Sequence, residues 1–383
     1  MKKKYLLAPG PTPVPPEALA AMSMPIIHHR SPEFTPILEA AKNDLKWLFQ
    51  TRNDVLILCS TGTGGMVGSV TNFLSPGDKA VVVRGGKFGE RWAEICEAYG
   101  VLPINIDVEW GRAVRPELIE RELKKDPSIK AVLIQASETS TGVMHDTQAI
   151  GKIVRRYKDT LFVVDAITAL GVIDIPVDEW GIDVCITGSQ KALMLPPGLA
   201  FVSVSDKAWK MAETARCARF YFDFPKERKN LAKNQTNFTS ASSLIVGLAA
   251  VLRMMKADGL EDIFARHDRL ARATRAAMKA LGLKLYARES PSTALTAVEV
   301  PAGIDGGALT RLMRDKYGVT VAGGQAQLKG RIFRIAHLGY SGAFDIIVAV
   351  AAVEMALREL GAEKIKLGKG VAAAQEILMQ EGV

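Results

Sequence analysis

Three short segments of this sequence place reactive or ligand-binding groups directly after apolar, strand-like runs. Residues 61–65 (Thr-Gly-Thr-Gly-Gly) precede a helical pattern, so their backbone N–H groups suit a phosphate at a helix N-terminus. Asp165 ends a buried apolar run, where a carboxylate needs a cation or a strong hydrogen-bond donor. Lys191 is followed by the apolar residues 192–195, which lower its pKa and favour the neutral amine that forms Schiff bases.

One ligand with a phosphate, a carbonyl and a protonatable ring would satisfy all three segments, and pyridoxal 5′-phosphate (PLP) has these groups. Taken singly, each segment also has a structural interpretation, as a tight turn, a helix N-cap or a buried ion pair. Two motifs of nucleotide-binding proteins are nearly present but incomplete. Val67 replaces the last glycine of a dinucleotide fingerprint, and Phe88 follows Gly86-Lys87 where a P-loop needs Ser or Thr.

The elements that must position these residues follow from the hydrophobic pattern. Apolar, β-branched runs alternate with amphipathic helical patterns such as 89–99 and 150–157. This alternation predicts a large α/β domain with a mostly parallel sheet whose strands are buried on both faces. The predicted strands are 55–59, 80–83, 131–135, 161–164, 184–187 and 200–204.

The pattern changes beyond about residue 250, where a smaller C-terminal α+β domain is predicted. Its elements are helices over 260–281, 307–316 and 344–360 and strands over 283–286, 294–300 and 332–336. The proline-rich residues 1–30 have no periodicity and are expected to form an extended N-terminal arm. The expected organisation is therefore an arm (1–30), a large domain (31–250) and a small domain (251–383).

Composition narrows the class of protein. The 383 residues, 48% hydrophobic and 23% charged, are typical of a globular chain of two or three folding units, and no apolar run approaches the ~20 residues of a membrane span. The net charge of +8 is scattered among acids, which argues against nucleic acid as a partner. The four cysteines form no Cys-x-x-Cys pair, and the first apolar run ends at Pro9. We expect a cytoplasmic protein without a metal site.

The order of these segments makes the sequence similar to the class V, fold-type I PLP-dependent aminotransferases, most closely the alanine/serine–glyoxylate (serine–pyruvate) family. The resemblance spans nearly the whole chain, and 26 residues separate Asp165 from Lys191. The matching stretches are 9–16, 29–34, 138–142, 164–165, 188–193, 196–198 and 333–339.

The resemblance implies roles for the matching residues. Lys191 is expected to form the Schiff base and move the proton, and Asp165 to keep the pyridine nitrogen protonated. Phe88 corresponds to the aromatic residue that stacks on the ring, where many relatives carry tryptophan. Arg334 corresponds to the arginine that binds the substrate α-carboxylate. The other cofactor-binding positions are Thr63, Gly64, Gly65, Thr139 and Gln190.

Two further residues, Thr236 and Thr239, correspond to a segment that reaches the phosphate of the neighbouring subunit. The resemblance therefore implies a homodimer with shared active sites. The sequence departs from the common pattern directly after this segment, because Ser240-Ala241 stands where relatives often carry proline.

The implied activity is transfer of the amino group of alanine or serine to glyoxylate or pyruvate by a ping-pong Schiff-base mechanism. A 2-aminoethylphosphonate aminotransferase is an alternative, although its substrate lacks an α-carboxylate for Arg334. A cysteine desulfurase needs a cysteine in its C-terminal part, whereas the last cysteine here is Cys217. A non-catalytic PLP-binding subunit of a larger complex is the alternative from another class, and it would not need Lys191 and Asp165.

Overall fold

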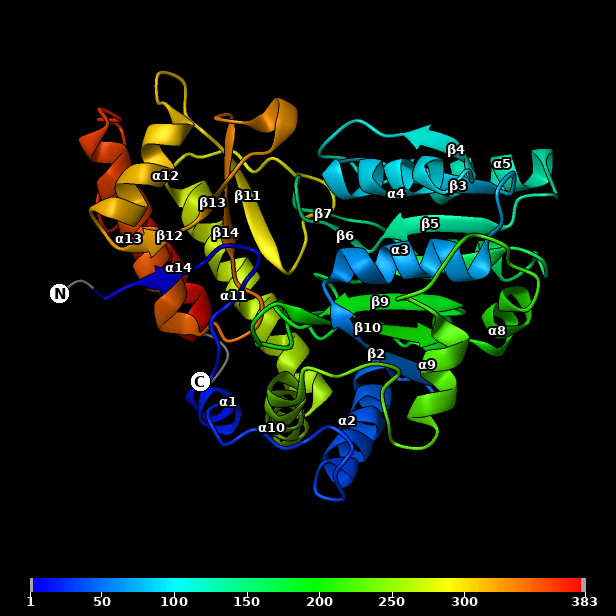
Figure 1. The fold of residues 1–383 in the computed structure, drawn as a ribbon. Helices are drawn as coiled ribbons and strands as arrows, with labels where there is room; N and C mark the ends of the chain where they lie inside the picture. Colours follow the sequence, from blue (N-terminus) through cyan, green and yellow to red (C-terminus); the bar gives the residue numbers. More distant parts are fainter. Residues whose placement is uncertain (1–2, 380–383) are drawn as a thin grey trace.

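The computed structural model describes residues 3–379, and its centre is a seven-stranded sheet (Figure 1). In the described chain only the second strand of this sheet is antiparallel to its neighbours, which confirms the mostly parallel α/β sheet. The ends of the expected arm and small domain, residues 1–2 and 380–383, lie outside the description. In spatial order the strands are β2 (Asp54–Ser60), β10 (Gly198–Val204), β9 (Val184–Gly188), β8 (Leu161–Asp165), β5 (Ala131–Gln135), β3 (Lys79–Arg84) and β4 (Leu102–Asp107).

The register of this sheet places the ends of its parallel strands at one edge. Ser60, the last residue of β2, lies opposite Gly198, and Gly188, the last residue of β9, lies opposite Ala200. Asp165 ends β8 and pairs with Ile186 of β9. Residues that follow β2, β8 and β9 therefore emerge together, at the edge where open α/β sheets bind ligands.

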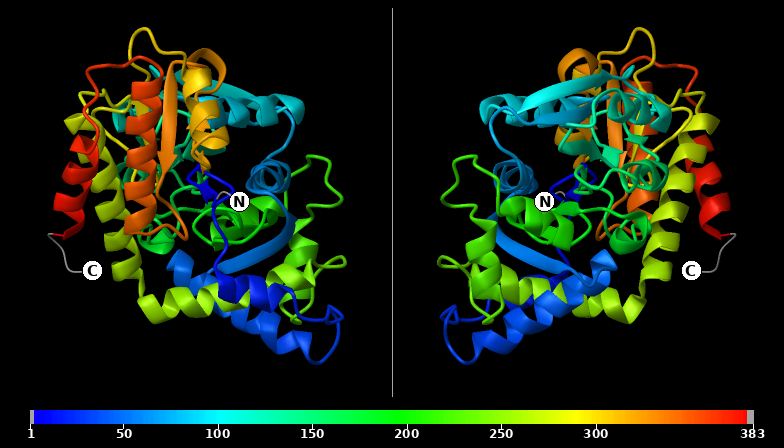
Figure 2. Two further views of the ribbon diagram at one scale, coloured as in Figure 1. Left: turned by 90° about the vertical axis from the view of Figure 1, so that its left-hand side faces the viewer. Right: turned by 90° about the vertical axis from the view of Figure 1, so that its right-hand side faces the viewer.

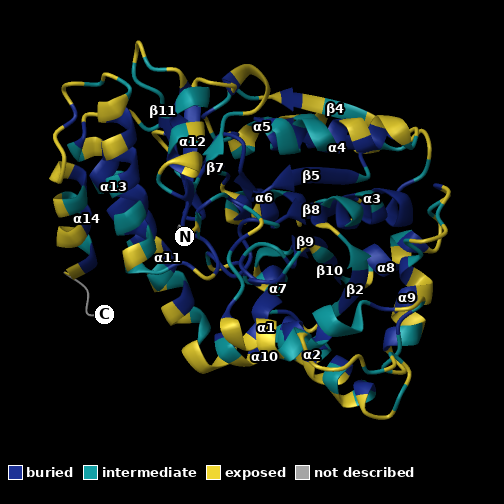
Figure 3. Ribbon diagram, turned by 60° about the vertical axis from the view of Figure 1, so that its left-hand side comes forward, coloured by how far each residue is buried: buried dark blue, intermediate teal, exposed yellow. Residues whose placement is uncertain are grey.

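The central strands are buried, as Figure 3 shows for β5 and β8, because helices cover the sheet. Helices α3 (Gly62–Phe73) and α4 (Lys87–Ala98) lie across one face (Figure 1). A Cβ atom on Gly65 would lie 2.7 Å from Ile186, so glycine allows α3 to approach the strands. The other helices of this part are α2 (Phe34–Phe49), α5 (Pro116–Lys125), α6 (Thr147–Val154), α7 (Val177–Trp180), α8 (Asp206–Ala212) and α9 (Phe224–Leu231).

Strand β4 was not predicted from the sequence. It lies at the edge of the sheet, where only β3 pairs with it, and most of its side chains are not buried. Pro103 interrupts the strand pattern, and an edge strand tolerates the missing N–H group.

The expected extended arm is wrong for residues 16–22, which form helix α1 (Pro16–Met22). Proline suits the first helical turn, and the helix buries Ala18 against α10 (Ser242–Asp258). Nearer the terminus, β1 (Tyr5–Leu6) pairs with β12 (Val319–Thr320) of the C-terminal part. Helix α10 continues through residue 250, the expected domain boundary, and packs on α1 and α2.

The chain turns at Gly259 into the long helix α11 (Leu260–Ala280), which rises beside α13 (Ala343–Glu359) and α14 (Lys369–Met379) (Figure 2). The sequence did not predict α14. The C-terminal part contains these helices, α12 (Gly306–Asp315) and an antiparallel sheet. The strands of this sheet are, in spatial order, β11 (Leu295–Glu299), β14 (Ile332–Ala336) and β13 (Ala322–Gly323). No helix within residues 3–379 combines the length and apolarity needed to cross a bilayer.

The strand predicted over 283–286 is wrong. Leu285 forms a single bridge to Val298, because the chain turns at Gly282 with a positive φ and bends again at residues 286–287. Pairing with β11 is therefore limited to one residue.

Candidate active site

The glycine-rich segment 61–65 forms the start of α3, directly after β2. The Gly64 and Gly65 N–H groups donate to the Thr61 carbonyl, at 2.8 and 3.3 Å. A Cβ atom on Gly64 would lie less than 3.0 Å from the Ser60 hydroxyl, so this position has no room for a side chain. The segment thus packs closely at a helix N-terminus, the kind of backbone position that suits a phosphate.

Asp165 and Lys191 lie close enough at this edge to affect each other's pKa. Burial raises the pKa of Asp165 to about 7, and the charge of Lys191 partly opposes this rise. Burial also lowers the pKa of Lys191 to about 8, again opposed by its partner. The Asp165 carboxylate accepts one hydrogen bond, 2.8 Å long, from the Ile167 N–H. The pair therefore consists of an acid whose charged form is stabilised by a nearby cation and an amine that is easily deprotonated.

The N-terminal segment closes over Lys191. The Lys191 amine donates a hydrogen bond to the Pro9 carbonyl. Thr12 fixes the backbone on either side of the same turn: its N–H donates to the Gln190 carbonyl at 3.1 Å, and its hydroxyl donates to the Lys191 carbonyl at 2.9 Å. The Gln190 Oε1 atom is buried without a hydrogen-bond partner among the described residues. A polar side chain beside the reactive amine is thus available to a ligand.

Arg334 reaches the site from β14, in the sheet of the C-terminal part. Its side chain is 4% exposed and donates from Nη1 to the Thr139 carbonyl at 2.8 Å and from Nε and Nη2 to the Gly323 carbonyl at 3.0 and 2.6 Å. Burial lowers its pKa to about 10, and the Glu138 carboxylate opposes this shift. Thr139 itself is buried, and its hydroxyl lies 2.8 Å from that of Thr168.

Phe88 lies in the first turn of α4 and is held by Glu138, which belongs to the short hairpin of β6 (Ser137–Glu138) and β7 (Val143–Met144). The Glu138 carboxylate accepts from the N–H groups of Phe88, Gly89 and Ser140, at 3.1, 3.0 and 3.1 Å. Full burial raises the pKa of Glu138, although these bonds oppose the rise. The bonds from Phe88 and Gly89 fix the helix N-terminus that carries the aromatic ring, and the bond from Ser140 lies within the hairpin itself.

The structure does not bring Thr236 and Thr239 to the residues around Lys191. Within residues 3–379, Thr236 is buried and donates to the Phe238 carbonyl at 2.7 Å, while the Thr239 carbonyl accepts from the Cys59 thiol at 3.9 Å. Thr239 is exposed. The expected contact with a neighbouring subunit's phosphate stays a prediction.

Sequence reasoning assigned no role to Gly10, Glu138 or Arg91, although all three touch residues of the site. Gly10 and Glu138 stand in segments singled out for the resemblance, and Arg91 lies three residues after Phe88 on one helix. The spacing of Phe88 and Arg91 was thus an available signal, since residues i and i+3 share a helix face.

The described residues fit PLP. The helix N-terminus at residues 61–65 offers a place for a phosphate, and the Asp165–Lys191 pair offers a pair of opposite charges. The Gln190 side chain has a buried Oε1 atom without a partner among the described residues, so its amide group is open to a ligand. Across the part of the chain that the structure describes, no three His, Cys, Asp or Glu side chains gather as a metal site requires.

Known proteins give the family. The family model named Aminotransferase class-V matches residues 4–337. The chain is 49% identical over 380 residues to the "Soluble hydrogenase, small subunit" of Synechococcus sp. (strain PCC 6716), with 98% of each chain covered. It is 40% identical over 377 residues to the L-aspartate–glyoxylate aminotransferase of Paracoccus denitrificans, with 97% of this chain and 95% of the relative covered.

A solved structure agrees with these relatives. The ureidoglycine–glyoxylate aminotransferase from Bacillus subtilis superposes with a TM-score of 0.94 at 32% identity, over 99% of this chain and 98% of that one. A family match over most of the sequence and similarity over the full described fold lead to one conclusion: the chain belongs to the class V aminotransferases, fold-type I enzymes that depend on PLP.

Proposed function

We propose that this aminotransferase moves the amino group of alanine or serine to glyoxylate or pyruvate. The observation that carries the proposal is that Arg334, from the small sheet, is held at the Thr139 carbonyl beside the buried Asp165–Lys191 pair. Bound PLP supplies an electron-accepting ring and a carbonyl. Names of two of the relatives above include glyoxylate as a substrate, which supports the acceptor.

Lys191 is the proton carrier in this proposal. Its lowered pKa of about 8 leaves part of the amine neutral near neutral pH, so it can take a proton from the substrate α-carbon and return one. Asp165 would hold the protonated ring nitrogen, since a cation beside this buried carboxyl group stabilises its charged form.

Arg334 would hold the α-carboxylate of the amino acid. A guanidinium group has five N–H donors, and three are used for the Gly323 and Thr139 carbonyls. Within the described residues, one N–H thus remains on each terminal nitrogen, which suits two-point binding of a carboxylate. An aminophosphonate donor would offer this arginine no α-carboxylate.

A visible absorption spectrum of the PLP-loaded protein tests the proposal. Alanine, serine, aspartate and 2-aminoethylphosphonate are added singly without acceptor, and we expect alanine or serine to remove the cofactor band and glyoxylate or pyruvate to restore it. A band changed only by aspartate or the aminophosphonate would overturn the donor. The Lys191→Ala variant is the control, because it should neither show the lysine-bound band nor sustain turnover.

A homodimer with shared sites is part of the same proposal. Three large aromatic side chains lie exposed near Thr239: Phe220 (77%), Tyr221 (49%) and Phe238 (36%). Such a patch is typical of a protein–protein contact. Mixing inactive Lys191→Ala with weakened Thr239→Ala protein should restore activity, because one site of the mixed dimer has both intact residues. No recovery in a verified mixed dimer would contradict shared sites.

A further inference from the structure

Arg91 joins two residues expected to contact PLP. It lies one turn after Phe88 on α4, and its Nη1 donates to the Thr63 hydroxyl at 3.1 Å. Its guanidinium carbon also lies 4.8 Å from the centre of the Phe88 ring. Arg91 therefore stands between the glycine-rich segment and the aromatic residue expected to face the cofactor ring.

Without Arg91, the expected phosphate site would lack a cation to balance the charge of the phosphate. A phosphate ester carries a charge between −1.5 and −2 near pH 7, as a rough general value. The expected phosphate ligands, Thr63, Gly64, Gly65 and Gln190, are all neutral. Of the nearby cations, Lys191 is the reactive amine and Arg334 is held at the Gly323 and Thr139 carbonyls.

The position of Arg91 leaves it available for an anion. Among residues 3–379 it makes one hydrogen bond, to Thr63, so most of its N–H donors are unused. Its charge also lowers the pKa of both Asp165 and Lys191, which places it within electrostatic reach of the whole site. A half-buried guanidinium group packed on an aromatic face is well suited to phosphate.

We propose that Arg91 binds the phosphate group of PLP and balances its charge, through N–H groups that Thr63 does not use. The proposal rests on PLP as the cofactor and not on the amino donor. Its test is therefore independent of whether alanine or serine is the amino donor.

The test compares PLP with pyridoxal, which lacks the phosphate, as ligands of cofactor-free Arg91→Gln and Arg91→Lys. We expect Arg91→Gln to weaken PLP binding about 10- to 100-fold, the usual effect of losing charge-assisted hydrogen bonds, while pyridoxal binding changes less than about threefold. Arg91→Lys keeps the charge and should lie in between. The ³¹P resonance of bound PLP should also titrate at higher pH in Arg91→Gln, because the neighbouring cation is gone.

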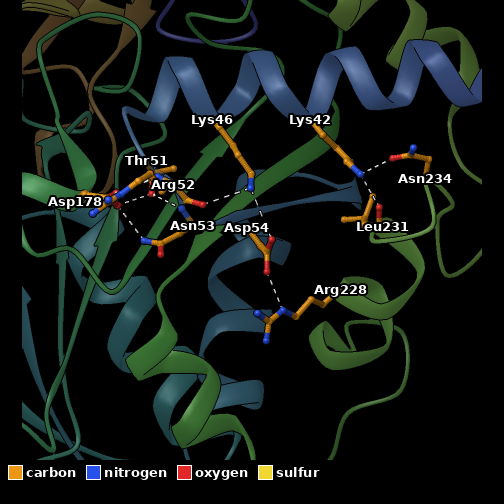
Figure 4. Close-up of polar contacts among 10 residues, drawn as sticks. All are labelled: Lys42, Lys46, Thr51, Arg52, Asn53, Asp54, Asp178, Arg228, Leu231 and Asn234. Carbon is orange, nitrogen blue, oxygen red and sulfur yellow. Dashed lines mark hydrogen bonds and ion pairs between the residues drawn. The ribbon is translucent and has the colours of Figure 1, made fainter.

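Arg228→Gln is the matched control. The Arg228 guanidinium carbon lies 4.5 Å from the Trp209 ring centre, and its Nε donates to Asp54 at 2.8 Å, at the opposite end of β2 (Figure 4). This variant also loses an aromatic contact and a side-chain hydrogen bond, here an ion pair with Asp54, and should leave the ratio of PLP to pyridoxal affinity unchanged.

Two results would overturn the proposal. If Arg91→Gln weakened the binding of PLP and of pyridoxal equally, Arg91 would act on the cofactor ring or on the fold. Unchanged PLP binding with a raised KM for aspartate would assign it to a substrate carboxylate. If Arg91→Gln does not fold, Arg91→Lys decides, because loss of the fork geometry should still lower the PLP affinity more than the pyridoxal affinity.

Discussion

Gly10 and Lys191 occupy adjoining space, because a Cβ atom on Gly10 would lie less than 3.0 Å from the amine nitrogen of Lys191. Gly10 also has a φ of +125°, which side chains disfavour. The N-terminal segment is therefore a wall of the active site, although 181 positions separate these residues.

Replacement of Gly10 by alanine should displace the Lys191 amine and reduce kcat about 10- to 100-fold, the usual result of a shift of about 1 Å in a reacting group. Gly303→Ala is the control, because Gly303 has a φ of +83° and open space around its Cβ position. Steady-state kinetics and thermal unfolding of both variants separate the effects. Equal losses of activity would mean that backbone strain alone explains them.

The stability of the cofactor-free protein should depend on Asp165. Burial raises its pKa to about 7, so the folded chain binds a proton that the unfolded chain releases near pH 4. Stability then falls as pH rises from about 4 to 7, by at most about 1.4 kcal/mol per pH unit for one group. Asp165→Asn should make this slope shallower in urea unfolding measurements.

Glu227 provides the comparison for this measurement, since burial raises its pKa to about 7 as well. Glu227→Gln should reduce the same slope, but only Asp165→Asn should also alter the absorption spectrum of bound PLP. An unchanged slope in Asp165→Asn would show that the carboxyl group is ionised in the cofactor-free protein.

Replacement of Arg334 by lysine should raise the KM for the amino acid about 10- to 100-fold, because lysine keeps the charge but not the two-point geometry. PLP affinity should be nearly unchanged, since the cofactor's expected ligands lie elsewhere. Because Arg334 also holds the Gly323 and Thr139 carbonyls, thermal unfolding of the variant is the necessary control. A normal KM would remove Arg334 from substrate binding.

Replacement of Glu138 by alanine should destabilise the protein by about 2–5 kcal/mol, because three buried N–H groups lose their acceptor. Glu138→Gln keeps one acceptor oxygen and should cost less. Urea unfolding measures both. A larger loss of unfolding free energy in Glu138→Gln than in Glu138→Ala would show that the carboxylate is not stabilised by these N–H groups.

Local pattern was sufficient for much of the fold, and it singled out Asp165 and Lys191, which the structure places within electrostatic reach of each other. Buried parallel strands consist of continuous apolar residues, so β5, β8 and β9 were predicted within one or two residues. Predictions failed where the pattern is weak or pairing is short, as at the edge strand β4 and at residues 283–286.

The sequence by itself determined that segment 61–65, Asp165 and Lys191 follow apolar strands, because this depends only on residue order and strand-forming runs. The tertiary structure decided which distant groups join them: the Pro9 carbonyl at Lys191, and the Thr139 carbonyl at Arg334. The physical reason is that these contacts link residues 182 and 195 positions apart, and side-chain patterns within one element carry no information about which elements pack together.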